Sequence, residues 1–201
     1  VEDVDDVDDI RHPIVRECLK KIGIKKGIEI ASIADVPART GLASSSAFTV
    51  CLLHVLYVYK GKSVSSKQLA EEACEIEIDI LKEPIGKQDQ YAVSFGGLNY
   101  IRFDRNGAVK VEPLMPSHET RLKLEKNLML FYAGGERDAR DILKKQKENM
   151  ISGSKFEALK KMVGLSERMK LSMKDNDTAG FAGLLHQGWL LKKTMVEGIS
   201  N

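Results

Sequence analysis

The stretch PARTGLASSSAFTVCLLHVLY, residues 37–57, decides how this sequence is interpreted. Ser44, Ser45 and Ser46 are of a type that often caps a helix N-terminus, and apolar residues follow at roughly helical spacing. We therefore predict a helix that begins near Ser44 or Ser45. Because a helix start carries free N–H groups and the positive end of the helix dipole, the serines fit either an ordinary cap or a phosphate-binding turn.

Composition indicates a globular chain. Its 201 residues, 43% of them hydrophobic, suffice to bury a core in one domain or in two small ones. No apolar stretch approaches the ~20 residues that span a bilayer, and the start does not have the order of a signal peptide, so we expect no membrane partner and a cytoplasmic location. Cys18, Cys51 and Cys74 are odd in number and far apart, which favours reduced core residues over a disulfide framework.

The charge is unevenly distributed although the net charge is only +2. Six of the 29 acidic residues lie in the opening VEDVDDVDDI, residues 1–10, which we interpret as a frayed lead-in. The remainder is mildly basic, as suits a phosphorylated small molecule. Its lysines are scattered without interleaved aromatic residues, so we expect no nucleic-acid partner.

The patterning predicts an α+β fold with a helical C-terminal third. Helices are expected at 12–23, 66–81, 136–150, 155–174 and 178–199, and strands at 27–35, 98–103, 108–114 and 127–135. In the helix over 66–81, Leu69, Ala73, Ile76 and Ile80 share one face. The Asn-Gly pair of the DRNG turn at 104–107 favours a β-hairpin between the second and third strands.

Three further features resemble nucleotide-binding or metal-binding motifs, but each lacks a residue that such a site requires. Gly61-Lys62-Ser63 resembles the end of a Walker A motif, but position 56 is leucine where the first glycine is required. Cys51 and His54 have a spacing that could hold a metal, yet no further ligands lie nearby, so we favour core packing. We interpret His186 in the same way.

Glu77 and Asp89 are more informative. Glu77 lies among apolar residues of a predicted helix, and Asp89 lies in GKQDQY beside Lys87, whose charge could keep the carboxylate ionised. Singly, each is typical of a solvated charge. Together with the serines they form a constellation suited to phosphoryl transfer: a phosphate cradle, Ser45 and Glu77 as Mg²⁺ ligands, and Asp89 facing the acceptor hydroxyl.

The stretch DVPARTGLASSSAFTVCLL, residues 35–53, resembles the signature of the GHMP small-molecule kinases. Residues 75–103, 130–143 and 184–201 narrow the resemblance to the branch that acts on heptose 7-phosphate. The resemblance implies a two-layer GHMP-kinase-like fold, with an N-terminal β-α-β domain over residues 1–114 and a ferredoxin-like C-terminal part with extra helices over residues 115–201.

The same resemblance implies roles for individual residues. It makes Asp89 the catalytic residue, Ser45 and Glu77 the Mg²⁺ ligands, and, with less support, Lys87, Gln88 and Arg137 substrate contacts. The ATP phosphates would be held by Gly41, Leu42, Ala43, Ser44, Ser45 and Ser46. Ala43 stands where a glycine is usual, and its methyl group could perturb the close approach of the backbone to phosphate.

The expected function is ATP-dependent phosphorylation of the anomeric hydroxyl of D-glycero-D-manno-heptose 7-phosphate. The alternatives are a kinase for another sugar, such as a fucokinase-like enzyme, and a non-catalytic phosphate-binding remnant. A sugar phosphate is the expected partner, with a homodimer left open. Because a basic N-terminal motif and a glycine-rich third motif of the family are not found, we expect the chain to resemble the middle of a kinase and to be inactive alone.

Overall fold

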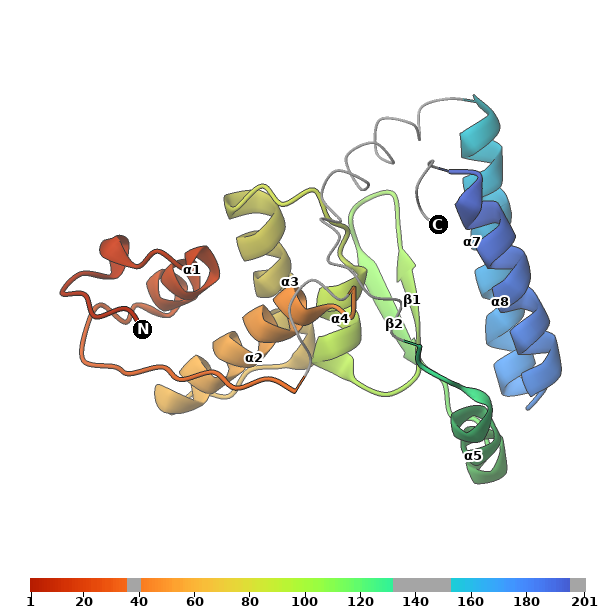
Figure 1. The fold of residues 1–201 in the computed structure, drawn as a ribbon, viewed down its shortest axis with the longest axis horizontal. Coiled ribbons are helices and arrows are strands. Elements are labelled where there is room, and N and C mark those ends of the chain that lie inside the picture. Colours follow the sequence, from red (N-terminus) through yellow and green to blue (C-terminus); the bar gives the residue numbers. More distant parts are fainter. Residues whose placement is uncertain (36–40, 132–152, 196–201) are drawn as a thin grey trace. The chain divides into compact units, whose positions relative to one another are not determined.

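The structure, a computed structural model, describes residues 1–35, 41–131 and 153–195. These residues belong to two compact units, Val1–Gly97 and Leu98–Asn201 (Figure 1). Helices combined with one small antiparallel sheet confirm the α+β class. The domain boundary expected between residues 114 and 115 stays a prediction, whereas the division between these units falls between Gly97 and Leu98.

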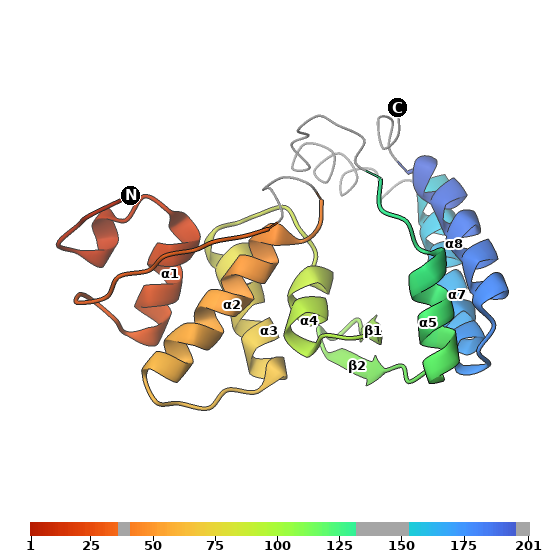
Figure 2. The same ribbon diagram turned by 60° about the horizontal axis from the view of Figure 1, so that its bottom comes forward.

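The first unit is helical in its described part. Its elements are η1 (Val7–Asp9), α1 (Pro13–Ile22), α2 (Ser44–Tyr59), α3 (Ser66–Cys74), the π-helical segment η2 (Glu75–Ile80) and α4 (Gln88–Phe95). As predicted, α1 ends at Gly23, which adopts φ 72°, a left-handed conformation that glycine accepts at little cost. Helices α2, α3 and α4 pack against one another (Figure 2).

The core of this unit is built around α2. Leu53 is fully buried, and so is Ile76 of η2. The other members are Cys18, Leu19, Ile24, Val50, Leu52, Leu56, Leu69 and Ala73. Burial of Cys18 and Cys74 confirms their prediction as core residues, whereas Cys51 is exposed. The core therefore holds the beginning of α2 and the η2 segment in one packed body.

Two expectations for this unit were wrong. Residues 27–35 do not form the predicted strand: Ile28 and Ile30 pack against the core, but Ile33 is exposed. A strand requires a hydrogen-bonded neighbour, and the described residues of this unit provide none, so they do not form the expected β-α-β arrangement. The acidic opening is also not frayed, because Asp8 pairs with Lys20 and Val7 packs against the core.

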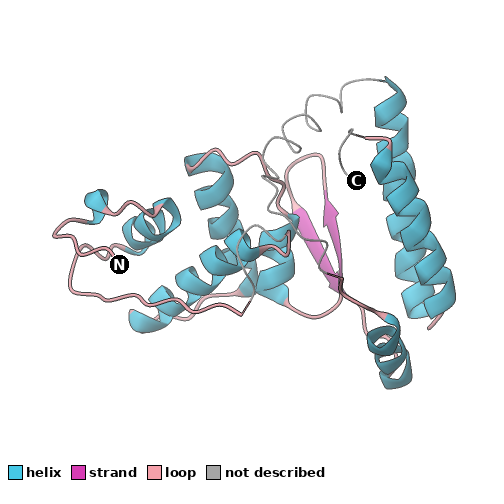
Figure 3. Cartoon of the chain, in the orientation of Figure 1, coloured by secondary structure: helices cyan, strands magenta, loops and turns pink. Residues whose placement is uncertain are grey.

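The second unit contains the predicted hairpin, β1 (Asn99–Phe103) and β2 (Val109–Pro113), shown in magenta in Figure 3. Ile101 lies opposite Val111 in the antiparallel register. Its helices are α5 (His118–Asn127), α7 (Gly153–Lys174) and α8 (Thr178–Lys193). Helix α5 was not predicted, although Ser117 caps it by accepting a hydrogen bond from the Thr120 N–H.

Polar contacts join the hairpin to α7 within this unit. Glu112 of β2 accepts hydrogen bonds from Lys170 at 2.5 Å and pairs with Lys174 at 2.8 Å. The hydroxyl of Tyr100 donates to Glu167. These contacts are exposed or only partly buried, so they set the orientation of the hairpin more than they stabilise it.

Other expectations for this unit are only partly tested. Residues 128–131 form no strand, and their side chains are exposed. The rest of that predicted strand and the helix over 136–150 lie outside the described residues. His186 is exposed on α8, so its prediction as a core residue was wrong. Among the described helices, none has the length and apolar character needed to cross a membrane.

Candidate functional site

The N-terminus of α2 begins where predicted but is not capped by its serines. Ala43 occupies the N-cap position with φ 58° and ψ 24°, and it makes no side-chain cap hydrogen bond. The three serines are therefore the first helical residues, and the ordinary-cap interpretation was wrong. The first intrahelical bond runs from the Ala47 N–H to the Ala43 carbonyl at 2.9 Å. The N–H groups that precede it can therefore bind an anion.

Ser45 and Glu77, 32 residues apart, are in direct contact. The Ser45 hydroxyl donates a hydrogen bond to Glu77 Oε1 at 2.5 Å. Ser45 itself is exposed at the start of α2, whereas Glu77 is fully buried. The pairing expected between a hydroxyl and a carboxylate is therefore present, and it joins an exposed residue of α2 to a buried glutamate of η2.

Glu77 lies on the buried side of its helix, four residues after the buried Ala73 and three after the buried Cys74. Helix α3 passes at residue 75 into η2, where the Leu81 N–H bonds the Ile76 carbonyl at 2.9 Å, five residues back. Glu77 is 0% exposed, whereas Ile80, at the end of these wider turns, is 45% exposed. Single π turns inside helices are frequent at functional sites. The predicted apolar face was therefore correct for Leu69, Ala73 and Ile76, which are buried, and wrong for Ile80.

Gln90 of α4 is a member of the cluster that the sequence analysis did not identify. Its side chain is fully buried, and its Nε2 donates to Glu77 Oε2 at 2.7 Å. The two carboxylate oxygens of Glu77 thus accept from different helices, α2 and α4. The only signal in the sequence is the amide that follows Asp89 in GKQDQY.

The donor atoms of this cluster fit a magnesium ion. Mg²⁺ prefers hard oxygen ligands and keeps several waters and phosphate oxygens, so a hydroxyl and one carboxylate are sufficient protein ligands. Glu77 is buried, yet no described residue forms an ion pair with it, and buried carboxylates usually have a cationic partner or a metal. The described residues hold no group of three or more His, Cys, Asp or Glu suited to a metal.

Asp89 lies in the first turn of α4, directly before Gln90, and is partly buried. Burial raises the pKa of its carboxyl above the usual range. No ion pair with Lys87 is found among the described residues, so the expectation that Lys87 keeps Asp89 ionised is not supported. Lys87 acts instead on Cys74, where its charge opposes the burial that raises the thiol pKa to about 11.

The remaining predicted site residues are exposed or lie outside the described residues. Gly41 and Leu42 are exposed just before α2, and Lys87 and Gln88 are exposed at the start of α4. Arg137 lies outside the described residues. Cys51 and His54 are exposed on α2, so their prediction as core residues was wrong.

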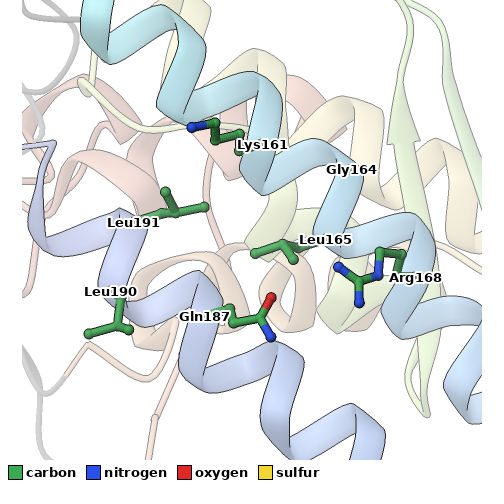
Figure 4. A pocket seen from close by; sticks show the side chains of 7 residues that line it. All are labelled: Lys161, Gly164, Leu165, Arg168, Gln187, Leu190 and Leu191. Atoms are coloured by element: carbon green, nitrogen blue, oxygen red, sulfur yellow. The ribbon is translucent and has the colours of Figure 1, made fainter.

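An open groove of about 520 Å³ lies between α7 and α8 in the second unit (Figure 4). Lys161, Arg168 and Gln187 supply its polar lining, and Leu165, Leu190 and Leu191 supply most of its apolar lining. It contains none of the residues expected to act in phosphoryl transfer. The cluster of Ser45, Glu77 and Gln90, with Asp89 beside it, is therefore the better candidate site.

Comparison with known proteins gives the context of this cluster. Residues 11–97 match the model of the GHMP kinases N terminal domain, a range that contains every member of the cluster. The chain is 29% identical over 192 residues to D-glycero-alpha-D-manno-heptose 7-phosphate kinase of Campylobacter jejuni, covering 96% of this chain and 56% of the relative.

Solved structures show the same fold. A D-glycero-D-manno-heptose 1-phosphate kinase from Bacteroides thetaiotaomicron matches with a TM-score of 0.75 and 26% identity, over 95% of this chain and 58% of that one. A proposed sugar kinase from Campylobacter jejuni matches with a TM-score of 0.54 and 24% identity, over 88% and 50% of the two chains. The chain thus spans little more than half the length of these relatives.

Proposed function

We propose that the protein transfers a phosphoryl group from ATP to a hydroxyl of a sugar phosphate, because residues 11–97 match the model of the GHMP kinases N terminal domain. The proposal covers the activity of the whole protein. A cytoplasmic location remains part of the same prediction.

The observation that carries the proposal is the contact between Ser45 and Glu77 at the uncapped start of α2. It joins an anion-binding helix end to a carboxylate within one hydrogen bond. Phosphoryl transfer depends on placing the phosphates and on neutralising the charge that spreads over their oxygens. A helix N-terminus next to a cation site supplies both.

The residues divide this work between them. The loop and first turn from Gly41 to Ser46 would hold the phosphates of ATP through backbone N–H groups. Ser45 and Glu77 would hold Mg²⁺, which neutralises phosphate charge when bound. Asp89 would orient the acceptor hydroxyl or take its proton, and the raised pKa of its carboxyl makes it a stronger base than an exposed aspartate.

The relatives support a heptose phosphate as the substrate class. Both the curated relative and the structure with the higher TM-score carry names of heptose phosphate kinases. We propose that the substrate is D-glycero-D-manno-heptose 7-phosphate and that its anomeric hydroxyl is phosphorylated. Lys87 and Gln88, exposed beside Asp89, would contact the sugar phosphate.

The test is coupled ADP release by the intact protein with ATP and Mg²⁺. Heptose 7-phosphate is compared with fucose, galactose and mannose, and Asp89→Asn serves as the control. We expect turnover with the heptose phosphate that is lost in the control. Turnover with a different sugar would replace the substrate but keep the reaction, and binding of ATP without any turnover would support a non-catalytic phosphate-binding protein instead.

A further inference from the structure

Gln90 is costly for the fold at its position in α4. Its side chain is fully buried, and its Oε1 has no hydrogen-bond partner among the described residues. A buried acceptor without a partner destabilises a fold, because the hydrogen bonds that it loses to water are not replaced. A leucine of similar volume would fill the same space without this penalty, so the amide requires an explanation other than packing.

The donor half of the same amide supplies that explanation. Nε2 lies 2.7 Å from Glu77 Oε2 and can only donate to it, because an ionised carboxylate only accepts. The Ser45 hydroxyl donates to the other oxygen at 2.5 Å. The plane of the carboxylate is therefore fixed from two sides, with lone pairs left on both oxygens.

We propose that Gln90 is a positioning residue that holds the Glu77 carboxylate in the orientation needed to bind a divalent cation together with Ser45. The inference rests on the proposed function, since it assumes that Glu77 is a metal ligand. Gln90 would touch neither the metal nor the sugar. Groups that orient a metal ligand in this way usually affect metal affinity by about 10–100-fold when they are removed.

The position of Gln90 adds a mechanical link. Asp89 precedes it in the first turn of α4. The hydrogen bond to Glu77 therefore connects the turn that carries the proposed base to the segment that carries the proposed metal ligand. Asp89 and Glu77 belong to one packed unit, so a displacement of one of these side chains would also displace the other.

The test measures metal binding directly. Mn²⁺ replaces Mg²⁺, and its binding to the intact protein with a non-hydrolysable ATP analogue is followed by electron paramagnetic resonance, after subtraction of the Mn²⁺ bound by the analogue alone. We expect Gln90→Leu to weaken Mn²⁺ binding about 10-fold. Its urea midpoint should fall, because Glu77 Oε2 stays buried without its donor, so Mn²⁺ binding is compared in the absence of urea on protein shown to be folded by circular dichroism.

A matched control is available in α3. Gln68 also donates through Nε2 to a glutamate, Glu72, at 2.9 Å, but it is exposed and outside the cluster. Gln68→Leu should leave Mn²⁺ affinity unchanged. In a Glu77→Gln background, Gln90→Leu should add no further loss, because a positioning residue has no effect without the group it positions.

The outcomes separate the two proposals. If Glu77→Gln leaves Mn²⁺ affinity unchanged, the metal assignment of the proposed function is overturned, and this inference with it. If Glu77→Gln weakens binding but Gln90→Leu stays within twofold of the parent protein, Gln90 only fills space and the inference alone is overturned. Should Gln90→Leu fail to fold, Gln90→Met, unbranched and adaptable in shape, gives the same comparison.

Discussion

The left-handed conformation of Ala43 leads to a quantitative prediction for Ala43→Gly. A backbone φ of 58° destabilises the folded state by about 1–2 kcal/mol for an L-residue, but not for glycine. Glycine also stabilises the unfolded state by about 0.4–1 kcal/mol, because its backbone has more conformational freedom there. The expected net gain in the free energy of unfolding lies between about 0 and 1.6 kcal/mol, with a midpoint of about 0.8 kcal/mol. For a unit of this size, about 100 residues, the midpoint corresponds to a rise in Tm of about 3–6 °C.

The assay is urea unfolding followed by circular dichroism at 222 nm, with Ala47→Gly as the control. Ala47 lies one turn later in regular helix, where its N–H bonds the Ala43 carbonyl, so the same substitution should destabilise by about 1 kcal/mol. The two Ala→Gly substitutions should therefore change the free energy of unfolding in opposite directions, because the backbone is left-handed at Ala43 and helical at Ala47. If Ala43→Gly lowers the urea midpoint as much as Ala47→Gly does, Ala43 is not left-handed in solution and the uncapped helix start is wrong.

Three other predictions follow from the same unit. Asp89→Asn should lower kcat about 100-fold without changing the KM for ATP. The same substitution should also raise Tm at pH 7, because burial raises the pKa of Asp89 in the folded state and its ionisation therefore disfavours folding. This gain in Tm should vanish as the pH falls through the pKa of the folded state. A gain in Tm that is independent of pH would contradict the role of burial. Glu77→Gln should raise the Mg²⁺ concentration for half-maximal activity, whereas Glu71→Gln, an exposed change in α3, should not, and equal Mg²⁺ titrations would remove the metal role. Leu53→Ala should cost about 2–5 kcal/mol of unfolding free energy and the exposed Val58→Ala about 0.5 kcal/mol or less, and similar urea midpoints for the two would show that α2 packs through a different face.

Local signals in the sequence were sufficient for the elements that local chemistry determines. Gly23 marks the end of α1 because a left-handed residue closes a helix there, and the Asn-Gly pair marks the hairpin turn. The start of α2 was also predicted correctly. The pairing of Ser45 with Glu77 was anticipated from residue types and from the family resemblance, and the structure places the two in contact.

The features that were missed depend on partners far away in the sequence. Residues 27–35 alternate like a strand, but alternation cannot supply the neighbour that a strand requires. Helical periodicity placed Cys51 on an apolar helix without showing which face of that helix would be covered. The place of Gln90 depends on its contact with the buried Glu77, 13 residues earlier in the chain. An amide in a short helix gives no sign of such a contact.

The π turn at Glu75–Ile80 also determines how this scaffold could gain or lose its site. A hydrogen bond that spans five residues encloses one residue more than the bond of an ordinary helix. Deletion of a single codon within the segment should therefore let α3 continue as regular helix, and a deletion before Glu77 would also turn its carboxylate to a new direction relative to Ser45. The π turn thus differs from a regular helix by one inserted residue. Under the metal role proposed for Glu77, a variant that makes this helix regular should weaken metal binding.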